Sequence, residues 1–204
     1  MTNPNSNKGF LFIVSGPSGV GKTVLCNEIV EKFSPKVVYS ISTTSRLPRG
    51  GEKNGQEYFF CSAADFEKAI GNNEFAEWAF VHGNYYGTPK KFLEDNLEAG
   101  RHVILNIDVQ GAMKIREQYP DSIMIFILPP TFEELESRIR KRNMDSENSL
   151  RHRLENARKE LGYREQYRYA IVNDNLETAI KELTDIFTGY VQRNGQSEVL
   201  DCRQ

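Results

Sequence analysis

The stretch from Gly16 to Thr23 contains residue types that together can hold a chain of phosphates. It matches the pattern Gly-x-x-x-x-Gly-Lys-[Ser/Thr] without departure. Glycines let the backbone wrap closely around a phosphate with its N–H groups pointing inward, and the Lys22 ammonium adds a full positive charge. The Thr23 hydroxyl can ligate Mg²⁺. The segment therefore predicts a site for a magnesium-bound nucleoside triphosphate, ATP or GTP, formed by Gly16, Pro17, Ser18, Gly19, Val20, Gly21, Lys22 and Thr23.

The residues on either side of this loop have the context that the pattern requires. An apolar run at 10–14 predicts a buried strand, and residues 22–33 have helical spacing of their apolar side chains. A glycine-rich turn with no ligand is therefore a poor explanation of the loop. The loop alone does not separate a kinase from a GTPase or a motor ATPase.

A second group of polar residues follows the strand that we predict at 37–41. Residues 42–56 form a long polar segment, and such segments in compact domains are usually functional or disordered. Two arginines, Arg46 and Arg49, can hold a phosphate through forked, charge-assisted hydrogen bonds. The phenols of Tyr58 and Tyr86 can donate to the same oxygens. Composition alone, however, favours solvated arginines on a surface loop.

Several spaced motifs together resemble the guanylate kinase family, and the resemblance runs from about Gly9 to about Val191. They occur in the family's order: Ser42-Thr-Thr-Ser-Arg46-Leu-Pro-Arg49, Gly51-Glu-Lys-Asn-Gly55 with Tyr58, Asn73-Glu-Phe-Ala-Glu77-Trp78, Gly83-Asn-Tyr-Tyr86-Gly-Thr88 and Ile107-Asp108-Val-Gln-Gly111. The resemblance implies a P-loop nucleoside monophosphate kinase-like α/β fold. It also implies transfer of the γ-phosphate of ATP to GMP, and to dGMP, with Mg²⁺ bound as MgATP, in purine nucleotide metabolism and GMP recycling.

The resemblance also implies roles in binding the acceptor. The residues that match those holding the GMP phosphate are Arg46, Arg49, Tyr58 and Tyr86, and those that match the guanine readers are Ser42, Glu77 and Thr88. Asp108 is also expected in the GMP site. The chemistry fits, because guanine offers N1–H and N2–H₂ donors to a carboxylate such as Glu77. Adenine has no donor at N1 and would leave a buried carboxylate poorly paired, which is costly.

One position departs from the family's pattern. Asn106 stands where the resemblance leads us to expect an acidic residue. An amide oxygen can still accept a hydrogen bond, but it carries no charge. Two residues on, Asp108 matches a family aspartate at the end of a predicted strand. The sequence leaves open whether Asp108 reads guanine or supports Mg²⁺ through water.

Residues 131–161 form two predicted charged helices with a polar break at 143–148. Composition alone favours solvated helix faces. By resemblance, Arg138, Arg142 and Arg153 are lid arginines that close over the triphosphate and act in catalysis with Lys22 and Arg46. Phosphoryl transfer depends on positioning and charge stabilisation, which arginines on a mobile segment supply while excluding water. The resemblance also places Asn173 near the adenine.

The predicted elements that must position these residues are short apolar strands alternating with helices. This order is typical of a mostly parallel sheet, here of five strands, with helices on both faces. The strands are expected at 10–14, 37–41, 103–107, 123–128 and 170–172. The helices are expected at 22–33, 89–99, 111–118, 131–142, 149–161 and 176–191.

Residues 42–88 predict a small insertion that is mostly strand and loop. It contains a strand at 58–60, a helix at 62–71 opened by a capping box at Ser62 and Asp65, and a hairpin turning at His82-Gly83-Asn84. We therefore expect one domain at 9–192, with a core of 9–41, 89–136 and 162–192, an NMP-binding insertion at 42–88 and a lid at 137–161. Segments 1–8 and 193–204 are expected to be tails.

The overall composition narrows the function classes. Net charge is −2 over 204 residues, without the basic excess that a nucleic-acid interface needs. The longest apolar run, at 123–128, is too short to span a bilayer, so no membrane partner is expected. The three cysteines, Cys26, Cys61 and Cys202, are scattered and predict free thiols in a reducing compartment, so we expect the cytoplasm. The sequence leaves monomer and homodimer open.

Two other interpretations have distinct signatures. Some guanylate-kinase-like domains in scaffold proteins bind proteins without catalysis, but these typically have a damaged phosphate loop, whereas Gly16–Thr23 is complete. A related P-loop kinase acting on a different phosphorylated small molecule would share the loop but lack the guanine readers. A plain GTPase is disfavoured because no [Asn/Thr]-Lys-x-Asp motif occurs.

Overall fold

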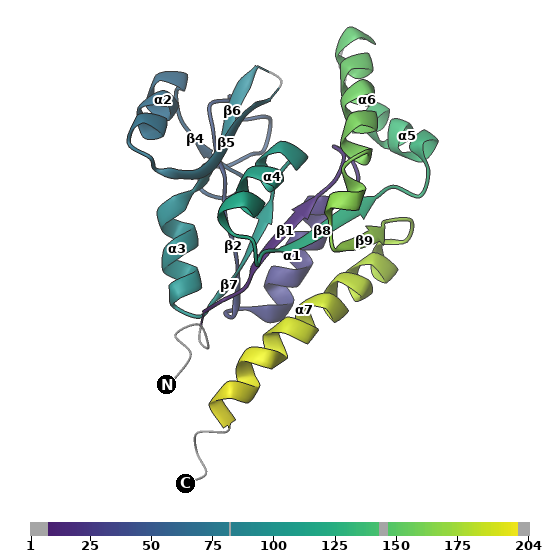
Figure 1. Ribbon diagram of the computed structural model, residues 1–204. Helices are drawn as coiled ribbons and strands as arrows, with labels where there is room; N and C mark the ends of the chain where they lie inside the picture. The colour runs from purple at the N-terminus through teal and green to yellow at the C-terminus, as the bar shows by residue number, and fades with distance from the viewer. Residues whose placement is uncertain (1–7, 82, 143–146, 200–204) are drawn as a thin grey trace.

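The computed structural model describes residues 8–81, 83–142 and 147–199 (Figure 1). Its main sheet has five parallel strands in the order β2-β7-β1-β8-β9. These are β1 (Leu11–Ser15), β2 (Val37–Tyr39), β7 (His102–Asn106), β8 (Ile123–Leu128) and β9 (Tyr169–Val172). The α/β class and the five-stranded parallel sheet predicted from the sequence are therefore confirmed.

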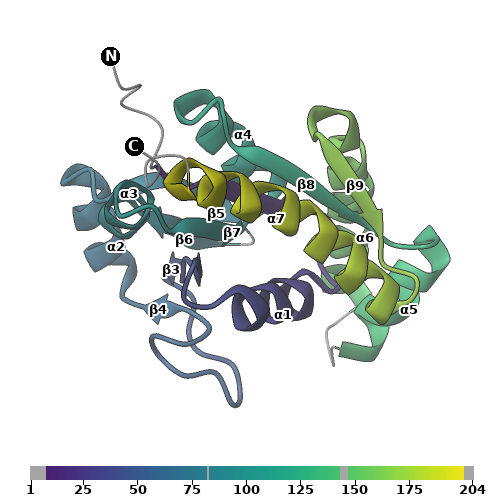
Figure 2. The same cartoon turned by 90° about the horizontal axis from the view of Figure 1, so that it is seen from below.

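Helices cover both faces of this sheet, and β1 sends alternate side chains to each face. Phe12 and Val14 pack into the core under α1 (Lys22–Phe33) and α7 (Leu176–Val199). Leu11 and Ile13 pack into the core under α3 (Lys90–Glu98) and α4 (Val109–Gln118). Figure 2 shows α4 and α7 on opposite sides of β8. Such two-sided burial explains why these strands read as continuous apolar runs.

The insertion forms a second sheet with strand order β4-β3-β6-β5. Its elements are β3 (Thr43–Thr44), β4 (Phe59–Phe60), α2 (Ala63–Gly71), β5 (Phe75–Val81) and β6 (Asn84–Pro89). The predicted hairpin is present, because β5 and β6 pair in antiparallel fashion. Its turn residue His82 lies outside the described residues. Strand β3 lies inside the segment expected to be loop, and only its pairing with β4 and β6 defines it.

The predicted helix cap at Ser62 is present, and a second cap lies at Thr131. The Ser62 hydroxyl accepts a hydrogen bond from the Asp65 N–H at 3.0 Å at the start of α2. The Thr131 hydroxyl accepts one from the Glu134 N–H at 3.1 Å, before α5 (Phe132–Arg142). Helix α6 (Glu147–Leu161) follows, and the predicted break at 143–148 falls partly on 143–146, outside the described residues. A short 3₁₀ turn, η1 (Arg164–Gln166), leads to β9.

The last helix is longer than the sequence suggested. We expected it to end at Val191, yet α7 continues to Val199, so residues 193–199 of the expected tail are helical. A single glycine inside a helix, such as Gly195, costs only about 1 kcal/mol, which neighbouring helix formers can offset. Within the described ranges, none of the helices is long and apolar enough to cross a membrane.

Candidate functional site

A cavity of about 720 Å³ lies at the carboxyl end of the main sheet. The insertion contributes one wall and α6 another, and these two parts stand on either side of the sheet in Figure 1. Strands β1 and β7 are neighbours, so the loop after β1 and the residues ending β7 meet at the floor. Most predicted site residues line this cavity: Gly16, Ser18, Gly19, Gly21, Lys22, Thr23, Ser42, Arg46, Arg49, Tyr58, Glu77, Tyr86, Asp108 and Arg153.

Other predicted residues are not among those lining the cavity. Pro17 and Val20 are buried within the phosphate loop, residues 16–23. Thr88 is fully buried behind Glu77. Arg138 donates from Nη1 to the Asn173 carbonyl at 3.1 Å and from Nε to Glu134 at 2.9 Å. The side chain of Arg142, at the end of α5, lies outside the part of the chain that the structure describes.

The phosphate loop is held closed by its own backbone and by Asn173. The Lys22 ammonium donates to the Gly16 carbonyl at 2.6 Å and to the Pro17 carbonyl at 3.1 Å. The Asn173 amide donates to the Val20 carbonyl at 2.7 Å. Gly21 has a φ of 99°, and a Cβ there would lie 2.4 Å from Asn173 Nδ2, so only glycine fits. Asn173 therefore braces the loop, and its contact with adenine stays a prediction.

The candidate magnesium ligand, Thr23, is in contact with Asn106. The amide nitrogen of Asn106 lies 3.2 Å from Thr23 Oγ1 and 3.2 Å from the Tyr39 hydroxyl, and donates to both. Burial raises the pKa of the Tyr39 phenol, so this hydroxyl stays protonated. At the end of β7, a neutral amide thus stands beside Thr23, where the family resemblance leads us to expect a carboxylate.

Glu77 is a buried carboxylate facing the cavity, with only 6% of its surface exposed. Its Oε1 accepts a hydrogen bond of 2.7 Å from the Thr88 hydroxyl. Burial raises the pKa of Glu77 to about 7, with a contribution from the negative charge of Asp108, while Thr88 and Lys114 oppose the rise. A Cβ on Gly111 would lie 2.8 Å from Oε2, so α4 passes close to this carboxylate.

Asp108 is the N-cap of α4, a structural role that the sequence analysis did not identify. Its Oδ1 accepts hydrogen bonds from the N–H groups of Gln110 at 2.8 Å and Gly111 at 2.9 Å. Capping of this kind satisfies N–H groups that have no partner within the helix. Oδ2 is thus the carboxylate oxygen that can meet a ligand. The signal in the sequence is an aspartate directly before a helical apolar pattern.

The arginines of the insertion are tied to a residue that the sequence analysis did not single out, Glu52. Its carboxylate accepts from Nη1 and Nη2 of Arg46, each at 2.9 Å, and from the Arg49 N–H at 2.7 Å. The pKa of Arg46 is raised, chiefly by Glu52, and the pKa of Glu52 is lowered, chiefly by Arg46. The Arg46 guanidinium also lies over the Tyr58 ring, 5.4 Å from the centre of the ring.

Helix α6 reaches the phosphate loop through two side chains two turns apart. Arg153 Nη2 donates to the Ser18 hydroxyl at 3.0 Å. Glu160, seven residues on, also lines the cavity, and burial raises its pKa to about 7 against the opposing positive charge of Lys22. The sequence analysis missed Glu160, although the i, i+7 spacing from Arg153 puts both on one helix face. Further lining residues that it missed are Val24, Ala79, Val81, Gly87, Ile107 and His152.

The chain matches known proteins over nearly its whole length. The sequence profile of the guanylate kinase family matches residues 8–190. A guanylate kinase from Carboxydothermus hydrogenoformans is 47% identical over 182 residues, covering 89% of each chain. One from Caldanaerobacter subterraneus subsp. tengcongensis is 45% identical over 179 residues, covering 88% of this chain and 86% of that one.

A solved structure agrees with these sequence matches. The crystal structure of guanylate kinase from Anaplasma phagocytophilum superposes with a TM-score of 0.78 at 34% sequence identity. It covers 97% of this chain and 96% of that chain. With the phosphate loop and the buried Glu77 facing one cavity, these matches agree with the resemblance carried by the motifs. The chain belongs to the guanylate kinase family.

Proposed function

We propose that the protein transfers the γ-phosphate of ATP to GMP and so forms ADP and GDP. The observation that supports this proposal is that one cavity is lined on one side by residues of the loop 16–23 and on the other by the buried carboxylate of Glu77. A kinase needs both sites within one enclosure, because the two phosphates must meet in line. The binding-module alternative gains no support from a complete loop that opens onto such a cavity.

On the donor side, residues 16–23 hold the triphosphate through backbone N–H groups and the N-terminus of α1. The Lys22 ammonium moves from the carbonyls of Gly16 and Pro17 to the β- and γ-phosphates. Arg153, already beside Ser18, neutralises charge on the transferred group, and Arg138 and Arg142 assist from α5. The lid is assigned to 137–161 and the NMP-binding insertion to 42–88.

The site fits a magnesium ion carried by ATP. Mg²⁺ prefers oxygen ligands and keeps several waters, and the cavity offers the Thr23 hydroxyl directly and the Asp108 carboxylate through water. Asn106 orients the Thr23 hydroxyl by the hydrogen bond between them. When bound, the ion neutralises charge on the β- and γ-phosphates.

On the acceptor side, Glu77 accepts from N1–H and N2–H₂ of guanine, Ser42 completes the recognition, and Thr88 orients the Glu77 carboxylate from behind. Arg46, Arg49, Tyr58 and Tyr86 hold the phosphate of GMP. None of these roles involves the ribose 2′-hydroxyl, so dGMP is also a substrate. The attacking oxygen belongs to a phosphate that is already ionised, so no protein nucleophile is required. Closure of α6 excludes water and thereby limits hydrolysis of ATP.

These substrates place the protein in purine nucleotide metabolism, and the free thiols of Cys26 and Cys61 fit a reducing cytoplasm.

Product analysis tests the reaction itself. Incubation with MgATP and GMP, followed by ³¹P NMR, should give ADP and GDP in equal amounts. ADP accompanied by inorganic phosphate, with no GDP, would overturn the proposal.

A further inference from the structure

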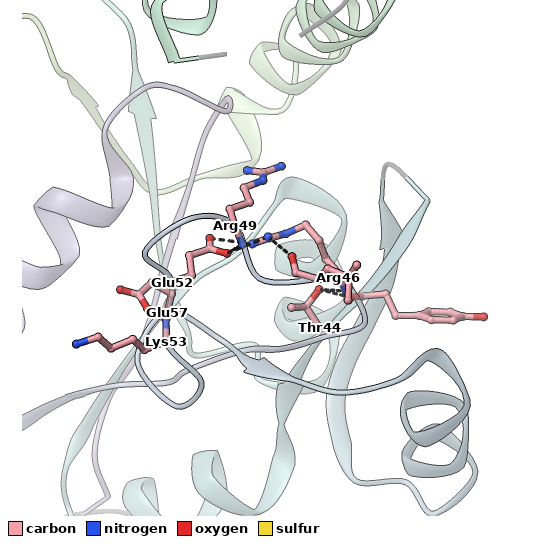
Figure 3. Close-up of polar contacts among 8 residues, drawn as sticks. Thr44, Arg46, Arg49, Glu52, Lys53 and Glu57 are labelled. Atoms are coloured by element: carbon pink, nitrogen blue, oxygen red, sulfur yellow. Dashed lines mark hydrogen bonds and ion pairs between the residues drawn. The ribbon is translucent and has the colours of Figure 1, made fainter. Parts of the chain in front are cut away.

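Glu52 contacts both of the arginines proposed to hold the acceptor phosphate, Arg46 through its guanidinium and Arg49 through its backbone (Figure 3). It forms a two-pronged ion pair with Arg46, and it accepts from the Arg49 backbone N–H at 2.7 Å. The side chains of Arg46 and Glu52 are only 11% and 19% exposed, so the pair is largely shielded from water. All three residues line the cavity. A carboxylate in a site for a phosphate needs an explanation, because the two repel each other.

The geometry of the Arg46 guanidinium supplies that explanation. A guanidinium has five N–H groups in a rigid fork. Glu52 takes one N–H from Nη1 and one from Nη2, and the Leu47 carbonyl takes the second N–H of Nη1 at 2.7 Å. The other N–H of Nη2 and the Nε–H form a second parallel pair on the adjacent edge. Tyr86, another residue proposed to hold the GMP phosphate, also interacts with this guanidinium and contributes to its raised pKa. This edge has the spacing that matches two phosphate oxygens.

We propose that Glu52 is a positioning residue, which holds the Arg46 guanidinium by its outer edge so that the Nε/Nη2 edge is presented to the acceptor phosphate. This inference deepens the proposed function and rests on it. Glu52 is itself fixed, because its N–H donates to the Arg49 carbonyl at 3.1 Å while its carboxylate accepts from the Arg49 N–H. The turn thus anchors the carboxylate, and the carboxylate anchors the arginine.

Two effects of Glu52 oppose each other, and the contacts indicate which is larger. Its negative charge weakens the attraction of the site for GMP. Against this, a long arginine side chain loses rotamer freedom when it binds a ligand. Glu52 already restricts the rotamers of Arg46 in the unliganded protein, so less conformational entropy is lost when GMP binds. The ion pair is shielded and two-pronged, and the charge of Arg49 remains for the phosphate, so we expect the positioning effect to dominate.

Three variants separate positioning from charge. Glu52→Ala removes both hydrogen bonds to Arg46, and Glu52→Gln keeps the shape but removes the charge and one acceptor. Glu57→Gln is the matched control, because Glu57 is an exposed carboxylate in the same loop that accepts from the Lys53 backbone N–H at 2.7 Å (Figure 3). Each variant is assayed for KM and kcat, for binding of GMP and guanosine by calorimetry, and for thermal unfolding.

A positioning role predicts that only the binding of the GMP phosphate is weakened. Glu52→Ala should raise the KM for GMP about tenfold or more, Glu52→Gln by a smaller factor, and Glu57→Gln hardly at all. The KM for ATP and the affinity for guanosine, which has no phosphate, should stay within twofold of wild type. The effect on kcat should be smaller than the effect on the KM for GMP.

Other outcomes overturn the inference. A lower KM for GMP in Glu52→Ala would mean that the carboxylate obstructs the phosphate. An unchanged KM would mean that Glu52 is a bystander, and an equal loss of GMP and guanosine affinity would mean a general collapse of the insertion. In these three cases wild type still binds GMP. If the wild-type protein itself fails to bind or phosphorylate GMP, the proposed function is wrong, and the inference about Glu52 loses its basis.

Discussion

The Thr88 hydroxyl on β6 donates a 2.7 Å hydrogen bond to Oε1 of Glu77, its register partner on β5. The hairpin that creates this pair therefore also orients the carboxylate, and Oε2 faces Gly111 at the start of α4. A buried carboxylate needs such partners, because an unpaired charge away from water is costly.

The affinity for guanosine should depend on the ionisation of Glu77. Its pKa is about 7 in the unliganded protein, and only the carboxylate can accept from both guanine donors. Binding should therefore be maximal above pH 7 and weaken towards tenfold per pH unit below about pH 6. Calorimetry with guanosine, which has no phosphate to titrate, measures this from pH 5 to 8. A flat profile would contradict the role of Glu77, and Glu77→Gln should bind weakly without the dependence.

The same ionisation should affect stability without ligand. The folded pKa of Glu77 lies above its usual value of 4.5, so the folded state binds the proton more tightly between pH 4.5 and 7. The contribution of Glu77 to stability should consequently fall as pH rises through this window, by at most about 3 kcal/mol. Denaturant unfolding of wild type and Glu77→Gln, compared at pH 4.5 and 7.5, isolates this contribution. A difference between the two proteins that is independent of pH would exclude it.

Gly111→Ala should impair guanine binding while sparing the donor site. The added methyl group would lie 2.8 Å from Glu77 Oε2 and 3.1 Å from its Cδ, so the carboxylate must shift. We expect the KM for GMP to rise about tenfold or more, because small misplacements of a recognition group are costly. The KM for ATP should change little. Steady-state kinetics with each nucleotide varied in turn measures both.

Gly189→Ala is the control for this substitution. Gly189 is also helical, and a Cβ there meets no atom within 4 Å. Alanine should therefore stabilise α7 by about 0.5–1 kcal/mol and leave both KM values unchanged. If the two alanine variants behaved alike towards GMP, contact between α4 and Glu77 would not be the cause.

Lys22→Met should abolish most of the turnover and leave the fold intact. The hydrogen bonds from Lys22 to Gly16 and Pro17 lie within one loop, so their loss costs little stability. Loss of the ammonium from the transferred phosphate should lower kcat by at least about a hundredfold. A coupled assay and a thermal melt by circular dichroism measure the two effects. Turnover near the wild-type value would exclude the proposed role of Lys22.

The parts of the fold that the sequence predicted are those set by local pattern. The strand at 123–128 and the helix at 22–33 have the predicted bounds. Burial on both faces gives the strand a continuous apolar run, and the helix has a regular spacing of apolar residues, so both can be recognised from neighbouring residues alone. The two-residue strand β3 has no such pattern, since it exists only through pairing with distant residues. Helix α7 was underestimated because its apolar stripe stops near Val191 and polar residues follow, although the helix continues to Val199.

The parts of the site that lie within single sequence motifs could be predicted. Most residues of the phosphate loop, and most of those matched to the family's guanine and phosphate residues, line one cavity. Glu52 was missed, because its role arises from a turn that brings it onto Arg46 six positions away. The hydrogen bond from Asn173 to Val20 was also not predicted, because it joins residues 153 positions apart and no local pattern reveals it.

We propose that this cavity brings a triphosphate donor and a guanine monophosphate together for phosphoryl transfer. The most direct measurement is ADP formation with MgATP and each of AMP, GMP, CMP and UMP, expressed as kcat/KM. We expect the value for GMP to exceed that for AMP by at least about a hundredfold, because adenine leaves the buried Glu77 carboxylate without its N1–H partner. Equal values for the four monophosphates would contradict it.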